Sequence, residues 1–254
     1  MHALAAIALA ICVWIALMLV IRFWLEPWLR DGPDRNVFTG IMWRVLRVYC
    51  RVVHRATFNG LESLRNTIDA GPLIVVSNHT GAVDPLLLQA ACKFRIRWMM
   101  ASEMMISGLD WLWRHEQTIP VDRDGRDSGP AREAIRHVQA GGIIGIFPEG
   151  RIVTPPREIR PFATGVGLVV ARTKAPVLLV WVRGTPDTRD TIKSLTTPSR
   201  AEVTFIELID FAGEKDGHVI TNRLRRRLAE VSGWPLNDAP VPPSPDSLLR
   251  NATF

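Results

Sequence analysis

The sequence predicts an α/β protein, an open mixed sheet flanked by helices, with membrane-associated helices at the N-terminus. Short apolar runs bounded by turn residues, such as PLIVVS (72–77) and IIGIFPEG (143–150), alternate with segments of helical character. This alternation is typical of an α/β sheet whose strands are buried on both faces. A longer apolar run, residues 3–21, contains no charged side chain and is roughly long enough for a helix to cross a bilayer.

Length and composition favour one large domain. The chain has 254 residues, and residues 57–233 contain neither an internal repeat nor a long polar linker. We expect membrane-anchoring helices in residues 1–55, the domain in 56–233 and a Pro-rich tail in 234–254. The formal net charge of +6 favours an anionic partner such as a phospholipid surface or a phosphorylated substrate. Nucleic acid is not expected, because the aromatic content is low and no nucleic-acid-binding motif occurs.

The run 3–21 is interpreted as a membrane helix whose C-terminal end faces the cytoplasm. Trp24 and Trp28 follow it as candidate interface anchors, and the arginines beyond it favour the cytoplasmic side. A signal peptide would need a basic segment before the run and a small-residue cleavage site after it. A helix buried in the core is the other alternative. The three cysteines show neither metal-binding spacing nor a disulfide framework, which indicates a reducing compartment.

Residues 37–55 are expected to form a second helix at the membrane surface. Four arginines recur in it at helical spacing, namely Arg44, Arg47, Arg51 and Arg55. They would form a narrow stripe on an otherwise apolar helix, which suits an interfacial helix whose arginines reach phosphate headgroups. The alternative is an amphipathic helix docked on the domain with its arginines in solvent.

The turn after strand 72–77, SNHTGAVDP, contains a candidate general base. Asp84-Pro85 is a typical helix start, with Asp84 as N-cap and Pro85 as the first helical residue, and the helix is expected to continue through LLLQAACKF. His79 then lies in the strand-to-helix turn. An imidazole beside a carboxylate is a common general base near neutral pH. The two side chains can meet in a turn that closes onto a cap.

The remaining elements follow from the same criteria. Further strands are expected at 57–61, 118–123, 143–150, 175–184 and 201–211, and helices at 130–140, 165–174 and 221–231. Residues 94–120, rich in Trp and Met, fit either core packing or a groove for an acyl chain.

Three of the strands end in polar motifs: NHTGAVD, IPVDR and FPEGR. If these strands are neighbours in the sheet, His79, Asp84, Arg123 and Glu149 converge at one edge. The set provides a base, its orienting carboxylate, a cation and a second acid, and it requires no metal. The sequence contains no nucleophile elbow and no Gly-rich nucleotide loop.

Residues 55–190 resemble glycerolipid acyltransferases of the PlsC type, which include the 1-acylglycerol-3-phosphate acyltransferases. NHTGAVD matches their Asn-His-x4-Asp signature, and TIPVDR and FPEGR resemble their second and third motifs in the same order and at similar spacing. RPFATGVGLVVARTKAPVLLVWV resembles the segment leading into their fourth motif, and FPEGRI is similar to the bacterial lysophosphatidylethanolamine acyltransferase branch. The chain departs from the pattern at Gly81 (often Ser), Arg151 (often Thr) and Leu179 (usually Pro).

The resemblance implies that residues 56–233 form an acyltransferase domain that works without a covalent enzyme intermediate. His79 would be the general base on the acceptor hydroxyl, and Asp84 would orient its ring. Arg123 would bind the acceptor phosphate, since a guanidinium can bind two oxygens at once. The acceptor site would also include Glu149, Gly150 and, as either a second phosphate contact or a surface residue, Arg151.

The implied partners are a phospholipid membrane, acyl-CoA or acyl carrier protein as the donor, and a lysophospholipid acceptor, first of all lysophosphatidic acid. No cofactor and no metal are implied. The implied location is the cytoplasmic face of a membrane, the inner membrane of a bacterium. Two alternatives stay open: an inactive lipid-binding or membrane-remodelling scaffold, and an acyl-thioester hydrolase in which the same base activates water.

Overall fold

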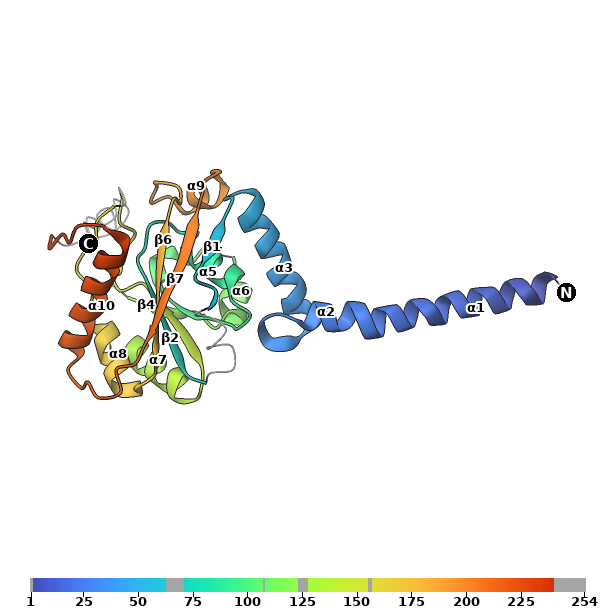
Figure 1. Cartoon of the computed structure of the whole chain (residues 1–254), viewed down its shortest axis with the longest axis horizontal. Helices are drawn as coiled ribbons and strands as arrows, with labels where there is room; N and C mark the ends of the chain where they lie inside the picture. The colour runs from blue at the N-terminus through green and yellow to red at the C-terminus, as the bar shows by residue number, and fades with distance from the viewer. Residues whose placement is uncertain (1, 63–70, 107, 123–127, 155–156, 240–254) are drawn as a thin grey trace.

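A seven-stranded mixed sheet forms the centre of the fold (Figure 1). The computed structural model describes residues 2–62, 71–106, 108–122, 128–154 and 157–239. The strand order is β1-β7-β6-β2-β5-β3-β4. The strands are β1 (Thr57–Asn59), β2 (Leu73–Ser77), β3 (Arg97–Ala101), β4 (Ile119–Val121), β5 (Ile143–Ile146), β6 (Val177–Arg183) and β7 (Glu202–Ile209). Only the β6–β7 pair is antiparallel among these neighbours, so the predicted mixed sheet is confirmed.

Helices cover both faces of the sheet, which explains its continuously apolar strands. α7 (Gly129–Gln139), α8 (Gly165–Thr173) and α10 (Gly217–Ser232) pack on one face, and α3 (Val37–Val52) and α5 (Asp84–Ala91) pack on the other (Figure 1). In β2, Ile74 and Val76 belong to the first core, whereas Leu73 and Val75 belong to the second. Because successive residues are buried on opposite faces, β2 has no polar alternation.

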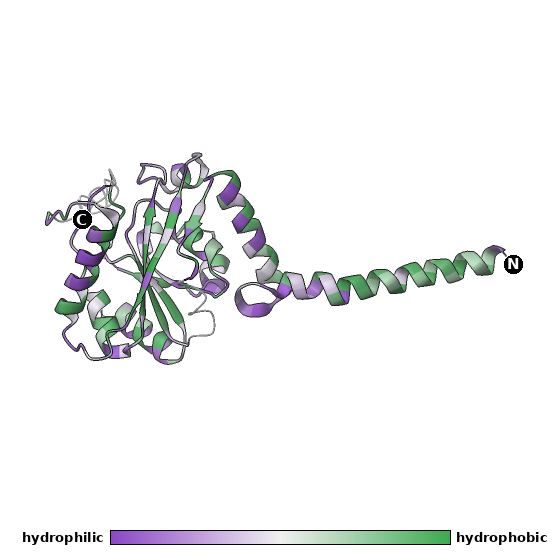
Figure 2. Cartoon of the chain, in the orientation of Figure 1, coloured by the Kyte–Doolittle hydropathy of each residue, from purple (hydrophilic) through white to green (hydrophobic). Residues whose placement is uncertain are grey.

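The N-terminal apolar run forms a long helix that projects away from the sheet. α1 (His2–Val20), the π-helical turn η1 (Ile21–Leu25) and α2 (Glu26–Arg30) follow one another as a continuous helix of 29 residues. Within the described chain none of its residues is buried, and it is hydrophobic along most of its length (Figure 2). By length and composition this helix could cross a membrane.

The second N-terminal helix, α3, combines the two arrangements considered from the sequence. The buried Trp43 anchors it to α5 by donating its indole N–H to the carbonyl of Gln89 at 3.1 Å. The opposite side is apolar and exposed, and it carries Phe38, Ile41, Met42, Val45, Val48 and Val52. α3 is therefore docked on the sheet domain, but the surface it leaves open is apolar.

The arginine stripe of α3 differs from the prediction at both ends. Arg44 donates to the carbonyls of Trp28 and Leu29, near the C-terminal end of α2, and its guanidinium lies 3.9 Å from the centroid of the Trp28 ring. A cation is favourable there because the last carbonyls of a helix lack internal partners. Arg44 is therefore held by the corner between α2 and α3, a role that the prediction of a lipid-facing stripe did not include. Arg55 lies beyond the end of the helix, which is at Val52.

Among the described elements of the sheet domain, the sequence prediction missed β3, α6 (Asp110–His115) and α9 (Thr191–Thr196). Most of β3, with the sequence RWMMA, is only half-buried, so it shows neither a buried run nor regular alternation. Its position matters, because β3 lies between β5 and β4. The strands that end in IPVDR and FPEGR are therefore not neighbours, contrary to the condition under which all three motifs would meet.

The first residues of the predicted tail contact the domain. Leu236 forms a β-bridge with Ile159, and Arg225 forms an ion pair with Asp238 at 2.8 Å. The rest of the tail, residues 240–254, lies outside the described residues.

Candidate active site

The parallel pairing of β2 with β5 brings two of the predicted motifs together. Val76 and Ile146 are paired in register, so the turns that follow both strands leave the same edge of the sheet. The backbone N–H of His79 donates to Oε1 of Glu149 at 3.4 Å, and the N–H of Val153 donates to the carbonyl of His79 at 2.9 Å. The turn containing His79 is therefore held against the segment that follows β5.

Asn78 fastens this turn to the neighbouring strand on the other side. Its side-chain amide donates to the carbonyl of Val182 and accepts from the N–H of Val182, both at 2.8 Å. The Asn78 side chain thus extends the hydrogen bonding between β2 and β6 beyond the last paired residues, where the main chain of β2 turns away. The sequence prediction gave Asn78 no role, although a buried Asn at a strand end is a signal for such a bond.

His79 and Asp84 form the expected pair. Nδ1 of His79 lies 2.9 Å from Oδ2 of Asp84, and the two side chains are 13% and 0% exposed. Because a carboxylate only accepts hydrogen bonds, Nδ1 carries the proton in the neutral ring and Nε2 is left as the acceptor. This is the tautomer that a general base requires.

Asp84 occupies a different place in its helix from the one predicted. Val83 is the N-cap of α5, and Asp84 is the first helical residue. Oδ2 of Asp84 turns back and accepts the backbone N–H groups of Thr80 at 2.7 Å and Gly81 at 2.9 Å. These bonds fix the carboxylate while it holds the imidazole.

Aromatic rings form a column behind the imidazole. The ring of His79 stacks on Phe147, with 4.2 Å between centroids and 15° between planes. Phe147 in turn stacks on Trp98, at 4.9 Å and 9°. Neither ring was predicted to belong to the site, because stacking across separate strands leaves no sequence pattern.

Glu149 is a buried carboxyl group next to the candidate base. Burial raises its pKa to about 8, and the negative charge of Asp84 acts in the same direction, although backbone N–H groups of His79 and Arg160 oppose the shift. Its Oε2 is buried and has no hydrogen-bond partner among the described residues. At pH 7 Glu149 is therefore mostly a neutral acid that can donate a hydrogen bond.

The other predicted site residues are placed less tightly. Gly150 has φ +71°, and no described atom lies within 4 Å of a Cβ placed at this position, so the backbone conformation is what favours glycine here. Arg151 follows it and is half-buried. Arg123 lies outside the described residues, and β4 ends at Val121. The structure thus brings together His79, Asp84 and Glu149, with Gly150 and Arg151 following Glu149 in the chain.

Thr185, which follows β6, and Ser194 on α9 contact the turn and explain one departure from the family pattern. A Cβ at position 81 would lie 3.1 Å from Oγ of Ser194 and 3.3 Å from Oγ1 of Thr185. Thr185 also donates to the hydroxyl of Thr80 at 2.8 Å, and Ser194 accepts from the N–H of Val83 at 3.3 Å. Gly81 leaves room for these hydroxyl groups where a serine would crowd them.

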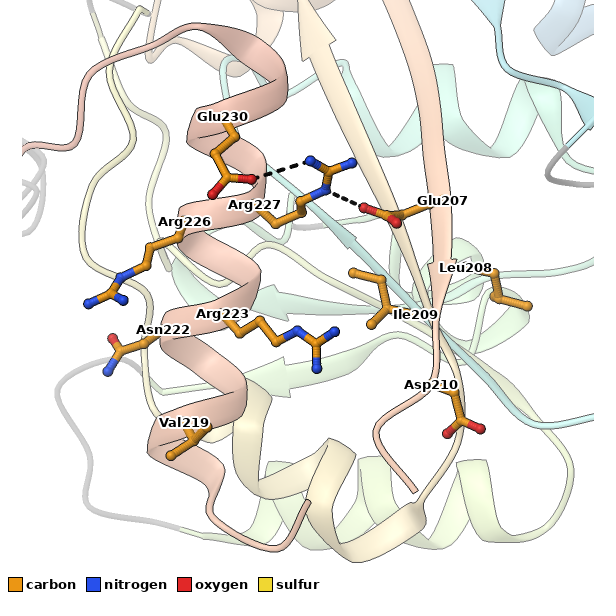
Figure 3. A pocket seen from close by; sticks show the side chains of 10 residues that line it. All are labelled: Glu207, Leu208, Ile209, Asp210, Val219, Asn222, Arg223, Arg226, Arg227 and Glu230. Atoms are coloured by element: carbon orange, nitrogen blue, oxygen red, sulfur yellow. Dashed lines mark hydrogen bonds and ion pairs between the residues drawn. The ribbon is translucent and has the colours of Figure 1, made fainter. Parts of the chain in front are cut away.

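A separate surface groove of about 670 Å³ lies between α10 and β7 (Figure 3). It contains equal numbers of arginines and carboxylates, and Arg227 pairs with Glu207 and Glu230. Glu207 and Ile209 pair with the first residues of β6, so the groove lies towards the edge of the sheet opposite His79. It takes no part in the candidate site.

Comparisons with known proteins agree with this arrangement. The family model named Acyltransferase matches residues 55–183. The chain is 23% identical over 164 residues to an N-acylphosphatidylethanolamine synthase from Arabidopsis thaliana, covering 58% of each protein. The crystal structure of the 1-acyl-sn-glycerophosphate (LPA) acyltransferase PlsC from Thermotoga maritima matches with a TM-score of 0.62 and 18% identity, over 92% of this chain and 97% of that one. Because the family model covers half of the chain and includes the His79–Asp84 turn, the protein belongs to the acyltransferase family, with a PlsC-like fold.

Proposed function

We propose that the protein transfers a fatty acyl group from a thioester, acyl-CoA or acyl carrier protein, to a hydroxyl group of a lysoglycerophospholipid, with lysophosphatidic acid as the first candidate acceptor. The observation that carries this proposal is the His79–Asp84 pair, in which Nε2 is left as a proton acceptor at the edge of the sheet. Family membership supports acyl transfer, and the basic chain with its long apolar helix favours an anionic lipid acceptor.

The proposed reaction needs one base and no covalent intermediate. Nε2 of His79 takes the proton of the acceptor hydroxyl while the oxygen attacks the thioester carbonyl. The C–S bond then breaks, and the imidazolium returns the proton to the departing sulfur, so the products are an ester and a free thiol. Asp84 keeps the ring in the reactive tautomer and stabilises its positive charge.

The acceptor is proposed to lie against the residues that follow β5. Glu149, as a neutral acid, would donate a hydrogen bond to an acceptor oxygen, and the main chain at Gly150 would approach the ligand closely. Arg123 and Arg151 would bind the phosphate. The donor is a co-substrate, and no cofactor takes part.

The membrane is proposed to hold the enzyme through residues 1–55. The helix from His2 to Arg30 would insert, and the exposed apolar side of α3 would lie in the interface. The sheet domain would then face the cytoplasm, with residues 56–233 as the acyltransferase domain and 234–254 as a tail.

A thiol-release assay with and without lysophospholipid tests the proposal. Release that depends on lysophosphatidic acid is expected, whereas release without any acceptor indicates a hydrolase and no release indicates a scaffold. Phosphatidylethanolamine belongs among the acceptors, because the Arabidopsis relative is an N-acylphosphatidylethanolamine synthase. His79→Ala should lower turnover about 10²–10⁴-fold. His218→Ala, which removes an exposed imidazole on α10, should leave turnover unchanged.

A further inference from the structure

The strongest feature that the proposed reaction does not yet use is the column of rings behind His79. Its three members come from separate parts of the chain: the turn after β2, the segment after β5, and β3. Their planes are nearly parallel, at 15° between His79 and Phe147 and 9° between Phe147 and Trp98. Because both contacts in the column are nearly parallel, we infer that the surrounding packing holds each ring at a fixed angle.

The column is built into the sheet. Trp98 on β3 is paired with Gly145 on β5, and a Cβ at position 145 would collide with the indole ring. Glycine inside a strand is unfavourable unless another group must approach the backbone closely. Gly145 therefore allows the flat indole to lie over β5, where it supports Phe147 from behind.

The face of Phe147 lies where positive charge develops during the proposed reaction. When His79 takes the proton from the hydroxyl, its ring becomes an imidazolium ion. The negative face of an aromatic ring attracts a cation within about 6 Å of its centroid, and Phe147 lies 4.2 Å from the ring centre of His79. Asp84 binds the edge of the imidazole at Nδ1, whereas Phe147 contacts its face.

We propose that Phe147 is a positioning residue that stabilises the imidazolium form of His79 through its ring face, and that Trp98 and Gly145 hold Phe147 in place. This inference rests on the proposed role of His79 as a base. It gives Phe147, the first residue of FPEGR, a function that is distinct from the acceptor contacts proposed for the residues after it.

Two variants separate charge stabilisation from simple space filling. Phe147→Leu keeps an apolar side chain but removes the ring face, and Phe147→Trp keeps a ring face with a stronger attraction for cations. Phe205→Leu is the matched control, since it removes a buried ring on β7 in the core without touching the column. Gly145→Ala should change kcat and the pH profile in the same direction as Phe147→Leu, because the added methyl group displaces Trp98.

The first measurement is steady-state kinetics across pH. Phe147→Leu should lower kcat about 3–10-fold with little change in the acceptor KM, and should move the acid limb of the kcat/KM profile about half a pH unit towards lower pH. Phe147→Trp should restore both. Asp84 binds the His79 ring at Nδ1 and Glu149 accepts from the backbone N–H of His79, and neither carboxyl group is altered in these variants.

The second measurement does not depend on acyl transfer. Diethyl pyrocarbonate modifies neutral imidazole, so the pH dependence of His79 modification, followed by peptide mass spectrometry, reports its protonation directly. The midpoint should move to lower pH in Phe147→Leu and stay unchanged in Phe205→Leu. If wild-type protein transfers no acyl group, the proposed function fails, and this profile still decides the role of Phe147. An unchanged midpoint in Phe147→Leu overturns the inference, as does a loss of kcat that Phe147→Trp does not restore.

Discussion

Glu149 should make the stability of the protein fall as the pH rises from acid to mildly alkaline values. The ordinary pKa of this carboxyl group is 4.5, and burial raises it to about 8 in the folded chain. Between these values the folded state binds the proton more tightly than the unfolded state does. The contribution of Glu149 to stability is therefore fully present below about pH 4.5 and is lost progressively up to about pH 8.

The magnitude follows from the size of the shift. Each pKa unit corresponds to about 1.4 kcal/mol, so the rise from 4.5 to about 8 corresponds to roughly 5 kcal/mol in the free energy of unfolding. About 3.5 kcal/mol of this is lost between pH 5 and pH 8. Glu149→Gln keeps the shape and the acceptor for the N–H of His79 but cannot ionise. The variant should match wild type at pH 5, where the Glu149 carboxyl group is protonated, and should be the more stable protein at pH 8, where that group is partly ionised.

Thermal unfolding of the full chain in detergent, at several pH values from 5 to 8, measures this difference. For a protein of this size 1 kcal/mol corresponds to about 2–4 °C in Tm, so the gap between Glu149→Gln and wild type should change by roughly 10 °C. Glu62→Gln, which removes an exposed carboxyl group, is the control and should follow wild type. A gap that stays constant from pH 5 to pH 8 would refute the assignment of Glu149 as a buried neutral acid.

Three further predictions concern the His79–Asp84 turn and the N-terminal helix. Asp84→Asn should lower kcat by at least about 100-fold, because an amide next to Nδ1 favours the wrong imidazole tautomer; circular dichroism must show a folded protein, and turnover close to wild type would contradict the role of the pair. Gly81→Ser should destabilise the protein by about 1–3 kcal/mol through crowding, and Ser194→Gly should recover part of the lost Tm; additive losses in the double variant would argue against direct contact. Full-length protein should stay with vesicles in high salt, whereas a variant lacking residues 1–36 should bind weakly through the apolar side of α3; release of the full-length protein by salt would show that the first helix does not insert.

Local sequence was sufficient for the central strands and for the His79–Asp84 pair. β2 and β6 are covered on both faces, so each strand is an unbroken apolar run. Such a run can be recognised without knowing which strands lie beside it. The pair was also predictable, because a turn closing onto a helix start brings residues a few positions apart together. One detail differs: Asp84 lies inside the first turn of α5 and accepts the backbone N–H groups of Thr80 and Gly81 instead of capping the helix.

Features made by contacts between distant segments required the tertiary structure. β3 was missed because its residues are half-buried and mixed, and its insertion between β5 and β4 separates two motifs that sequence order had suggested were adjacent. Arg44 belongs to a helical stripe by spacing, but the carbonyls of Trp28 and Leu29 near the end of α2 accept from it, and spacing cannot reveal these partners.

The chemistry of the site divides in the same way. The sequence by itself determined which residue types could act as base and orienting acid, because that depends on side-chain identity and short spacing. Only the tertiary structure decided that Glu149 is kept neutral and that Phe147 lies on the face of the imidazole, since burial and ring stacking arise from strands brought together by the sheet. Desolvation and face-to-face contact are properties of an environment, and no single segment of the chain contains that environment.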